Sequence, residues 1–472
     1  MSKNTLLYLS AVCLTASQAY KVAVINDFHV DLNYDAKTCT DGVSKEIKES
    51  HLLTKSADEA LGKYGCDPPL SLLETFLDKI SSSEGHLDFI IMPGDLVAHG
   101  LPLDPSNPKK GNYELLKQTI SSVSQTFAKY FPNTFVLPSL GNNDPKYHYM
   151  ALNEDDKDEY YGFIYQNWMQ TQSYNSNLKN FGTIKSTMLK GGYYRADIDS
   201  TLSVMAVNTL YFNEKNDISQ QGNDAQDHIT WIRDQFTQNP QRRFIVTNHI
   251  YPGAKYVGDS KDLFVDGFND QFFSILYEFR NQIVLEVSAH DHFADVRYHS
   301  NGDDKNKDFY HNILVAPGVS PVKNQNPGYA VFEIDSSTFI PENLKLTFLN
   351  LLAVSKSEIS SSNLPFRSVL LSDFGLNQLT ASALKDFKNK LEADDKLTYK
   401  YLVAKLGFDP NDSTEYETAM SIYVTDLGLL TKSKRKTYKF ICQMHMSKTK
   451  QELDQCISDA SNANDAAALF LQ

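Results

Sequence analysis

Seven side chains that can bind metal ions share one recurring position in the sequence. Each follows a short apolar, β-prone run where turn-forming residues begin, which is the pattern of a buried strand that ends in a loop. They are Asp27, His29, Asp95, Asn142, His249, His290 and His292. Carboxylate and imidazole groups are ligands of Zn, Fe or Mn. Taken singly, each residue also fits a polar turn or a hydrogen-bonded buried histidine, but their shared position predicts a common site.

The number of donors matches a centre with two cations. A binuclear hydrolytic centre needs one carboxylate that bridges both cations and three further donors for each. Two cations about 3.5–4 Å apart hold the attacking and leaving oxygens of an in-line displacement at phosphorus. The seven donors therefore indicate hydrolysis of a phosphoric ester.

The elements that must position these side chains alternate between strands and helices. Strands are predicted at 22–26, 88–92, 134–137, 202–207, 243–247 and 283–287, and helices at 70–80, 113–130, 224–236 and 271–279. This order is typical of a largely parallel sheet covered by helices, in which ligands bind beyond the carboxyl ends of the strands. We also expect helical structure over 153–180, and further strands at 313–316, 329–334 and 344–351.

The apolar spacing becomes helical from about residue 355, where a Ser-rich bridge covers 355–362. We therefore expect a catalytic domain over residues 20–354 and a C-terminal helical subdomain over 355–472. The chain contains 45 Lys and Arg residues against 58 Asp and Glu residues, a formal charge of −13. This balance argues against non-specific nucleic-acid binding, which requires cationic side chains, and is compatible with a small phosphorylated substrate.

The first 19 residues have the features of a secretory signal peptide. Lys3 gives the positive end, residues 6–14 the apolar run, and residues 17–19 a small-x-small cleavage site. A buried first strand or helix is the alternative. No later apolar run approaches the ~20 residues that span a bilayer. A glycosylation sequon occupies 411–413. These features predict a secreted or lysosomal protein.

Cleavage after Ala19 would leave four cysteines, and an even number in an oxidising compartment suggests two disulfides. Local pairing, Cys39 with Cys66 and Cys442 with Cys456, is the simplest of the three possible connectivities.

The order D-x-H, G-D, G-N-x-D, a lone His after a strand, and x-H-x-H resembles the calcineurin-like metallophosphoesterases. Within them, the chain is similar to the acid sphingomyelinase-like phosphodiesterases over about 22–456. The runs that carry this resemblance are PGDLVAH at 93–99, LKGGYY at 189–194, VNT at 207–209, VAPGVSP at 315–321 and FICQM at 440–444. The six-cysteine saposin domain is missing, as in the shorter members. The resemblance implies a four-layer α/β/β/α sandwich.

The resemblance also implies a role for each side chain. Asp95 would bridge two zinc ions. The first ion would also bind Asp27, His29 and His292, and the second Asn142, His249 and His290. A metal-activated hydroxide would attack phosphorus. His99 matches a family histidine near the leaving group and is expected to act as general acid or phosphate contact, although an exposed loop histidine is the alternative.

One residue departs from the family pattern G-N-H-D/E. Asn143 takes the place of the histidine that helps to protonate the leaving oxygen. An amide can donate a hydrogen bond but cannot deliver a proton. We expect slow turnover of substrates with poor leaving groups and a smaller effect on phosphoanhydrides. A second departure, Ala289 for the usual glycine, is mild.

The sequence thus predicts a secreted, zinc-dependent phosphodiesterase whose substrate is a phosphocholine lipid such as sphingomyelin or a nucleotide. The alternative is a catalytically weakened, metal-containing protein that binds phosphorylated ligands, an interpretation that Asn143 motivates. A cytosolic Mg- or Mn-dependent phosphatase would require that the predicted signal peptide be wrong. The sequence makes no prediction of the oligomeric state.

Overall fold

The computed structural model describes residues 19–39, 59–257, 259–301, 308–354, 363–425, 427–430 and 437–470. The predicted signal peptide, apart from Ala19, and the Ser-rich bridge at 355–362 lie outside the described residues. Cleavage after Ala19 therefore stays a prediction.

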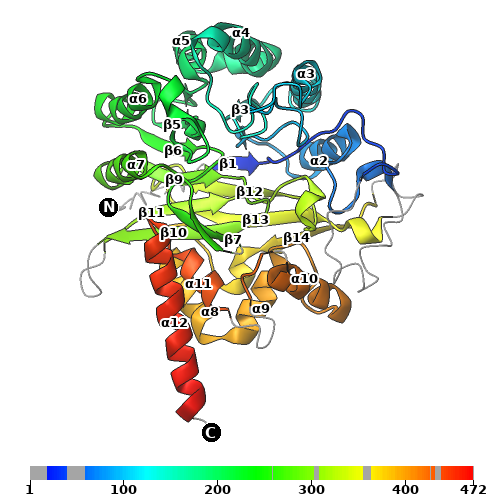
Figure 1. The fold of residues 1–472 in the computed structure, drawn as a ribbon, viewed down its shortest axis with the longest axis vertical. Helices are drawn as coiled ribbons and strands as arrows, with labels where there is room; N and C mark the ends of the chain where they lie inside the picture. Colours follow the sequence, from blue (N-terminus) through cyan, green and yellow to red (C-terminus); the bar gives the residue numbers. More distant parts are fainter. Residues whose placement is uncertain are drawn as a thin grey trace, which may run out of the picture.

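Two six-stranded sheets form the centre of the molecule (Figure 1). The first has the order β14-β13-β12-β1-β2-β3. Its strands are β1 (Ala19–Val24), β2 (Phe89–Met92), β3 (Phe135–Pro138), β12 (Gly328–Asp335), β13 (Pro341–Leu349) and β14 (Phe366–Leu370). β1, β2 and β3 are parallel, whereas β12, β13 and β14 are antiparallel to their neighbours. Val22, Ala23 and Val24 are fully buried, which explains the uninterrupted apolar run of a central strand.

The second sheet has the order β10-β11-β9-β6-β5-β4. Its strands are β4 (Tyr194–Asp197), β5 (Leu202–Ala206), β6 (Arg243–Thr247), β9 (Ile283–Ser288), β10 (Asp295–Asn301) and β11 (Asp308–Val315). β5, β6, β9 and β11 are parallel, and the edge strands β4 and β10 are antiparallel. A short hairpin, β7 (Ala254–Val257) and β8 (Asp259–Asp262), lies outside both sheets.

Helices cover one face of each sheet, and aromatic contacts show which. Phe76 of α2 (Leu70–Ser83) packs edge-on against Tyr329 and Phe366 of the first sheet, beside α3 (Tyr113–Tyr130). Phe236 of α6 (Asp224–Gln238) packs against Phe244 of the second sheet, beside α7 (Asp266–Glu278). The sheets contact each other through β3 and β5. The expected α/β/β/α sandwich is confirmed. The predicted helical stretch 153–180 contains α4 (Glu154–Tyr165) and a π-helical turn, and α5 (Phe181–Gly191) follows.

The C-terminal region is mainly helical, as expected, and packs on the second sheet. It contains α8 (Ala381–Ala393), α9 (Asp395–Ala404), α10 (Ser413–Thr425), α11 (Tyr438–Met444) and α12 (Lys450–Phe470). α8 and α11 contact β10, and α12 contacts the β7–β8 hairpin before it extends away from the sheets (Figure 1). β14, which the sequence did not predict, also follows residue 354 and pairs with β13, so this region contributes a strand to the first sheet. The boundary at 354/355 stays a prediction.

Over the described ranges, none of the helices combines the length and the apolar character that crossing a bilayer requires.

Candidate metal centre

The seven predicted ligands all lie beyond the carboxyl ends of parallel strands, and the structure brings them together. Asp27 and His29 follow β1, Asp95 follows β2 and Asn142 follows β3, three adjacent strands of the first sheet. His249 follows β6, and His290 and His292 follow β9, which are neighbours in the second sheet. The ends of the two sheets therefore supply one site between them.

Five of the seven predicted ligands have a left-handed backbone, which is uncommon for residues with a Cβ. The φ angles are 47° at Asp27, 44° at His29, 57° at Asp95, 76° at His290 and 64° at His292. Among the described residues, only four other non-glycine residues have positive φ. Such strained backbone is retained where surrounding structure fixes it and clusters at functional sites. The strand ends turn sharply here to point these side chains at one another.

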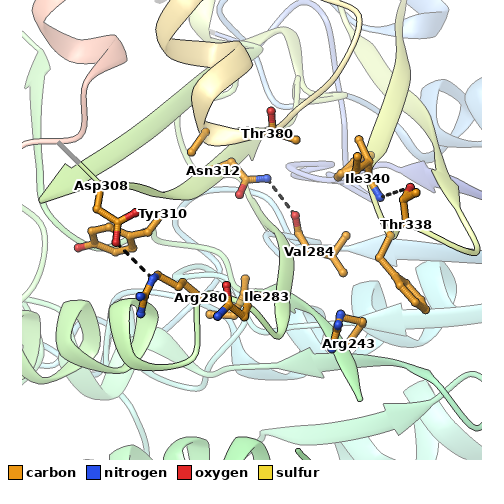
Figure 2. Close-up of a pocket in the computed structure, with 14 residues that line it drawn as sticks. Arg243, Arg280, Ile283, Val284, Asp308, Tyr310, Asn312, Thr338, Ile340 and Thr380 are labelled. Atoms are coloured by element: carbon orange, nitrogen blue, oxygen red, sulfur yellow. Dashed lines mark hydrogen bonds and ion pairs between the residues drawn. The ribbon is translucent and has the colours of Figure 1, made fainter. Parts of the chain in front are cut away.

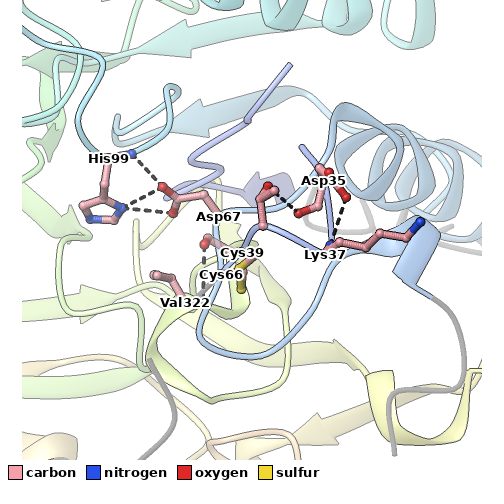
Figure 3. The surroundings of a disulfide bond; sticks show 9 residues. Asp35, Lys37, Cys39, Cys66, Asp67, His99 and Val322 are labelled. Carbon is pink, nitrogen blue, oxygen red and sulfur yellow. Dashed lines mark hydrogen bonds and ion pairs between the residues drawn. A yellow bond between two sulfur atoms is a disulfide. The ribbon is translucent and has the colours of Figure 1, made fainter. Parts of the chain in front are cut away.

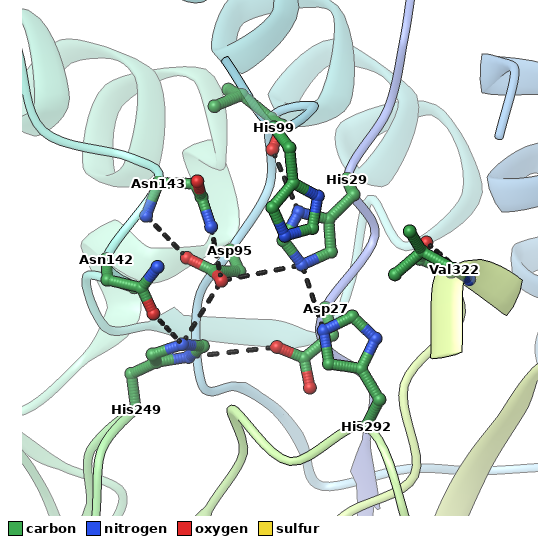
Figure 4. Close-up of polar contacts among 12 residues, drawn as sticks. Asp27, His29, Asp95, His99, Asn142, Asn143, His249, His292 and Val322 are labelled. Carbon is green, nitrogen blue, oxygen red and sulfur yellow. Dashed lines mark hydrogen bonds and ion pairs between the residues drawn. The ribbon is translucent and has the colours of Figure 1, made fainter. Parts of the chain in front are cut away.

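Asp95 lies at the middle of the cluster (Figure 4). Its Oδ2 is 3.4 Å from His29 Nε2 and 3.2 Å from His249 Nε2. His29 Nε2 is also 3.2 Å from His292 Nε2, and one ligand atom each of Asp27, His29 and His292 lies within 4.8 Å of the others. Asp95, His249 and His290 form a second such group, and His249 Nε2 is 3.0 Å from Asn142 Oδ1. Asp95 is shared between two sets of donors.

The predicted ligand atoms are arranged as a cation requires, because hydrogen-bond acceptors face one another. His29 Nδ1 lies 3.2 Å from the carbonyl oxygen of Val97, and His249 Nδ1 lies 3.0 Å from that of Pro93. An N–H that donates to these carbonyls leaves both Nε2 atoms as acceptors that point at Asp95. Buried Asp27 Oδ1 has no hydrogen-bond partner. Buried polar atoms without partners are rare, and this convergence of acceptors fits bound metal ions.

The electrostatics of the cluster agree with this interpretation. Burial lowers the pKa of the His29, His290 and His292 imidazoles well below the ordinary value, which keeps them neutral as metal ligands must be. Burial also raises the pKa of Asp27 to about 7. For His249, burial lowers the pKa but the charge of Asp95 outweighs it, and the pKa rises to about 9. A proton on His249 must therefore leave when a cation binds the same atoms.

The family to which these features point is settled by comparison with known proteins. The family model described as "Calcineurin-like phosphoesterase" matches residues 20–294, more than half of the chain and a range that contains all seven predicted ligands. The chain belongs to this family. The predicted enzyme class, a phosphoric diester hydrolase, is confirmed at the level of the family, and the Asp and His groups described above can hold a metal ion.

Three curated relatives make the similarity more specific. "Sphingomyelinase phosphodiesterase D" of Dictyostelium discoideum is 23% identical over 300 residues, which are 62% of this chain and 63% of that protein. "Acid sphingomyelinase-like phosphodiesterase 3b" of Mus musculus is 22% identical over 416 residues, 84% of this chain and 85% of that protein. "Cyclic GMP-AMP phosphodiesterase SMPDL3A" of Homo sapiens is 23% identical over 342 residues, 69% of this chain and 70% of that protein. The predicted resemblance to the acid sphingomyelinase-like phosphodiesterases is confirmed.

Asn143, at the position of the family histidine, is directed at Asp95 rather than at open space (Figure 4). Its backbone N–H donates to Asp95 Oδ1 at 2.7 Å, and its side-chain Nδ2 donates to Asp95 Oδ2 at 2.9 Å. The side chain is 1% exposed. In this structure Asn143 therefore orients the central carboxylate, which is a positioning contact.

Asp144, to which the sequence assigned no role, fixes the loops that carry Asp95 and Asn142. Its carboxylate accepts hydrogen bonds from the backbone N–H groups of Gly141, Asp95 and Leu96, at 2.7, 2.9 and 2.7 Å. A Cβ on Gly141 would lie 2.2 Å from Asp95 N, so only glycine permits this close approach of the two loops. The Gly-Asn-x-Asp spacing was the available signal for Asp144, because a carboxylate three residues after a glycine can cap the same turn.

His99 stands at the edge of the centre. Its ring stacks on that of His29 with the centroids 4.1 Å apart, and its side chain is 41% exposed. Asp67 holds it, with Oδ1 2.9 Å from His99 Nδ1 and Oδ2 accepting from the His99 backbone N–H at 2.6 Å (Figure 3). Burial lowers the pKa of His99, but the hydrogen bond and charge of Asp67 outweigh it and raise the pKa above the ordinary value. No sequence pattern pointed to Asp67.

The expected pairing of the cysteines is confirmed. Disulfides join Cys39 to Cys66 and Cys442 to Cys456, with Cα atoms 6.2 and 5.9 Å apart. Asp67 directly follows Cys66, so the first disulfide anchors the loop that holds His99 (Figure 3).

A pocket of about 240 Å³ lies at the other end of the second sheet, where β6 and β9 begin (Figure 2). Two polar contacts in its wall are made within the protein: Asn312 Nδ2 donates to the Val284 carbonyl at 2.9 Å, and Arg280 Nε lies 3.3 Å from Asp308 Oδ2. None of the predicted ligands lines it. The candidate chemistry is confined to the carboxyl ends of the strands.

Proposed function

We propose that this chain is a zinc-dependent phosphodiesterase that hydrolyses phosphodiester or phosphoanhydride bonds. The observation that carries the proposal is the convergence of acceptor atoms from five strand ends on the Asp95 carboxylate. The relatives are phosphodiesterases by name, which supports the same reaction class. The imidazole and carboxylate donors suit zinc.

Two ions account for the donor set. The first would bind the donors on the His29 side of Asp95, which are Asp27, His29 and His292. The second would bind the donors on the other side, which are Asn142, His249 and His290. Asp95 would bridge the two. Zinc ions at these positions supply Lewis-acid activation of water and neutralise charge on the phosphoryl group.

The remaining task, proton transfer to the leaving oxygen, falls to His99. Asp67 accepts the Nδ1 hydrogen bond, which leaves His99 Nε2 available to the substrate. The stacked ring of His29 holds the imidazole within reach of the metal ligands. Asn143 cannot share this task, because an amide delivers no proton and its Nδ2 is engaged with Asp95.

A second candidate function, a metal-containing protein that binds phosphorylated ligands with weak catalysis, is favoured by Asn143 alone. The complete set of donors around Asp95 favours the enzyme instead, since binding alone does not require a shared carboxylate. We also propose that the protein is secreted or lysosomal. The predicted signal peptide and the two disulfides support this, and N-terminal sequencing of the mature protein tests it.

One experiment tests both candidate functions. Purified protein is assayed on bis-p-nitrophenyl phosphate before and after removal of metal by a chelator, with zinc content measured by mass spectrometry. The proposal expects two zinc ions per chain, loss of hydrolysis on chelation, and recovery with added zinc. Metal-loaded protein that binds inorganic phosphate but hydrolyses nothing would support the binding protein.

A further inference from the structure

A fully buried glutamate lies in β9, the strand that leads to the predicted ligands His290 and His292. Glu286 is 0% exposed, and β9 lies between β6 and β11 inside the second sheet. Glutamate is almost never fully buried unless it has partners. The proposed reaction gives this side chain no task, so its contacts decide what it does.

Hydrogen-bond donors from the two neighbouring strands hold the Glu286 carboxylate. Oε1 accepts from Asn248 Nδ2 at 2.7 Å, where β6 ends, and Oε2 lies 2.6 Å from His311 Nε2 in β11. A carboxylate only accepts hydrogen bonds, so His311 donates through Nε2. Asn248 and His311 are also 0% exposed. The three side chains therefore form a connected, buried network across the sheet.

Asn248 links this network to the metal centre, because the predicted ligand His249 is the next residue. Both ends of the Asn248 amide are held: Nδ2 donates to Glu286, and Oδ1 accepts from Ser288 Oγ at 2.9 Å. Ser288 is the last residue of β9 and is 0% exposed. One amide side chain thus ties the end of β6 to the end of β9.

The backbone joins the same two strand ends. The N–H of Asn248 donates to the carbonyl of Val287 at 3.2 Å, and the N–H of Ala289 donates to that of His249 at 3.0 Å. His249 and His290 leave the sheet directly from this segment, and their rings meet edge to face with centroids 5.1 Å apart. Fixing the two strand ends therefore fixes the distance between two predicted ligands.

These two imidazoles belong to the same proposed zinc ion. His249 and His290 would bind the second ion together with Asn142 and the shared Asp95. The first ion depends less on these strand ends, since two of its donors follow β1. The network around Glu286 therefore supports chiefly the second ion.

Stability alone does not account for a polar network at this place. Replacing buried charged groups by well-packed apolar residues of similar volume is often neutral or stabilising. A fully satisfied polar network makes its surroundings rigid, and outer hydrogen bonds of this kind orient metal ligands. We propose that Glu286 is a positioning residue for the second zinc ion, which acts through Asn248 on His249 and His290. This inference rests on the proposed function, because that function places an ion at these imidazoles.

The test measures zinc affinity by competition with a chromophoric chelator, alongside the free zinc concentration that gives half-maximal hydrolysis of bis-p-nitrophenyl phosphate. In Glu286→Leu the Asn248 amide loses its acceptor. The affinity for the second zinc ion should fall about 10–100-fold, the usual loss for outer-shell changes. Activity should return when free zinc is raised by the same factor. Glu286→Gln keeps an oxygen that accepts from Asn248 and should restore most of the affinity.

A double variant tests the route through Asn248. Asn248→Leu alone should weaken binding of the second ion about as much as Glu286→Leu does. The double variant Asn248→Leu/Glu286→Leu should lose no more affinity than the single variants, because both remove the same connection. Affinity losses that multiply would overturn this route. Asn248→Leu leaves the contact between Glu286 and His311 in place, so it carries the same test if Glu286→Leu does not fold.

The matched control is Glu84→Leu, which removes another buried carboxylate. Glu84 is 4% exposed, and its oxygens accept from Tyr329 and Lys345 at 2.7 and 2.6 Å, in strands β12 and β13. This variant should lower the melting temperature and leave the zinc affinity unchanged. If Glu286→Leu lowers the melting temperature but keeps the zinc affinity, or if the control loses as much affinity, the positioning role is overturned.

Direct measurement of bound zinc keeps this result distinct from a failure of the proposed function. Wild-type protein that binds two zinc ions but hydrolyses nothing would refute the phosphodiesterase proposal, and the affinity comparison would still test Glu286. An active wild type whose zinc affinity survives both Glu286→Leu and Asn248→Leu would refute only the positioning role.

Discussion

The metal centre and the neighbouring ion-pair network both bury charged side chains, but only in the network does every carboxylate oxygen meet a cation or a hydrogen-bond donor. The network consists of Asp291, Asp295, Lys255, Arg297 and Lys405. All four of its carboxylate oxygens face a cation or a donor, at 2.6 to 3.2 Å. A buried charge that has such partners avoids most of the cost of leaving water.

The metal centre shows the opposite arrangement. Imidazole rings whose Nδ1 faces a backbone carbonyl direct their second nitrogen at Asp95, and Asp27 Oδ1 has no hydrogen-bond partner. Acceptors that outnumber the donors among them are stabilised when a cation joins them. The comparison teaches that burial of charge alone does not identify a functional site, whereas a surplus of acceptors does.

Removing the shared acceptor from the centre should have the largest effect. In Asp95→Asn the carboxylate that we propose as a bridge becomes an amide, so we expect kcat/KM on bis-p-nitrophenyl phosphate to fall about 10³-fold or more and the bound metal to fall with it, beyond the 10–100-fold typical of outer-shell changes. Metal analysis and steady-state kinetics measure both. Asp295→Asn is the matched change in the network and should keep its zinc. Full zinc content in Asp95→Asn would contradict the assignment of a bridge.

Removing a cation from the ion-pair network should reduce the stability of the fold rather than the activity. Lys405 Nζ lies 3.1 Å from Asp295 Oδ1 and is 4% exposed. Lys405→Met leaves that oxygen without its cation, and we expect the free energy of unfolding to fall by about 3 kcal/mol. Urea denaturation of the zinc-loaded protein measures this change.

The control for this prediction is the same substitution in a partly exposed pair. Lys388 Nζ lies 2.9 Å from Glu392, whose side chain is 58% exposed. Lys388→Met should cost less than about 0.5 kcal/mol, as is usual for surface pairs. Equal losses in the two variants would show that burial of the network has no energetic consequence.

A histidine in place of Asn143 would restore a proton donor at the metal centre. Asn143→His should raise the rate on sphingomyelin, whose alkoxide leaving group needs a proton, by about tenfold or more. The rate on bis-p-nitrophenyl phosphate, with a good leaving group, should not rise, because the variant also loses the Nδ2 contact to Asp95. No gain on sphingomyelin in detergent micelles would show that Asn143 is not what limits this reaction.

The sequence predicted the cluster of side chains because each member depends on a local pattern, an apolar strand followed by a polar turn. The carboxyl ends of parallel strands meet at one edge, so seven dispersed residues could be assigned to one place. The residues alone suggested a single largely parallel sheet; the second sheet came from the family resemblance. The polar edge strand β10 and the short β14 were missed, because edge strands have few apolar residues to mark them.

The contacts that position the site residues could not be predicted from the sequence, for a different reason. Asp67 is 32 residues from His99, and Lys405 is 110 residues from Asp295. Nothing local marks such pairs, since only the folded chain brings them together. The left-handed backbone of five ligands was equally hidden, because Asp and His carry no signal for positive φ as clear as that of glycine.

The smallest expected effect comes from the contact between Asp67 and His99 at the edge of the metal centre. The pKa of His99 is raised above its ordinary value through Asp67, so protonated His99 persists to higher pH. Activity that needs this proton is present below the folded-state pKa and is lost as the pH rises through it. Asp67→Asn should therefore move the alkaline limb of kcat on sphingomyelin to lower pH.

The same pair should make a small, pH-dependent contribution to stability. Because the folded-state pKa is the raised one, this contribution is fully present below the unfolded-state value of about 6.5 and disappears as the pH rises through the folded-state value. Its size is at most about 1 kcal/mol for a pair with an exposed member. Asp88→Asn, beside exposed His86 at 3.6 Å and remote from the centre, is the control and should leave the activity limb in place. A limb that moves to higher pH in Asp67→Asn would mean that His99 acts as a base rather than as the acid that protonates the leaving group.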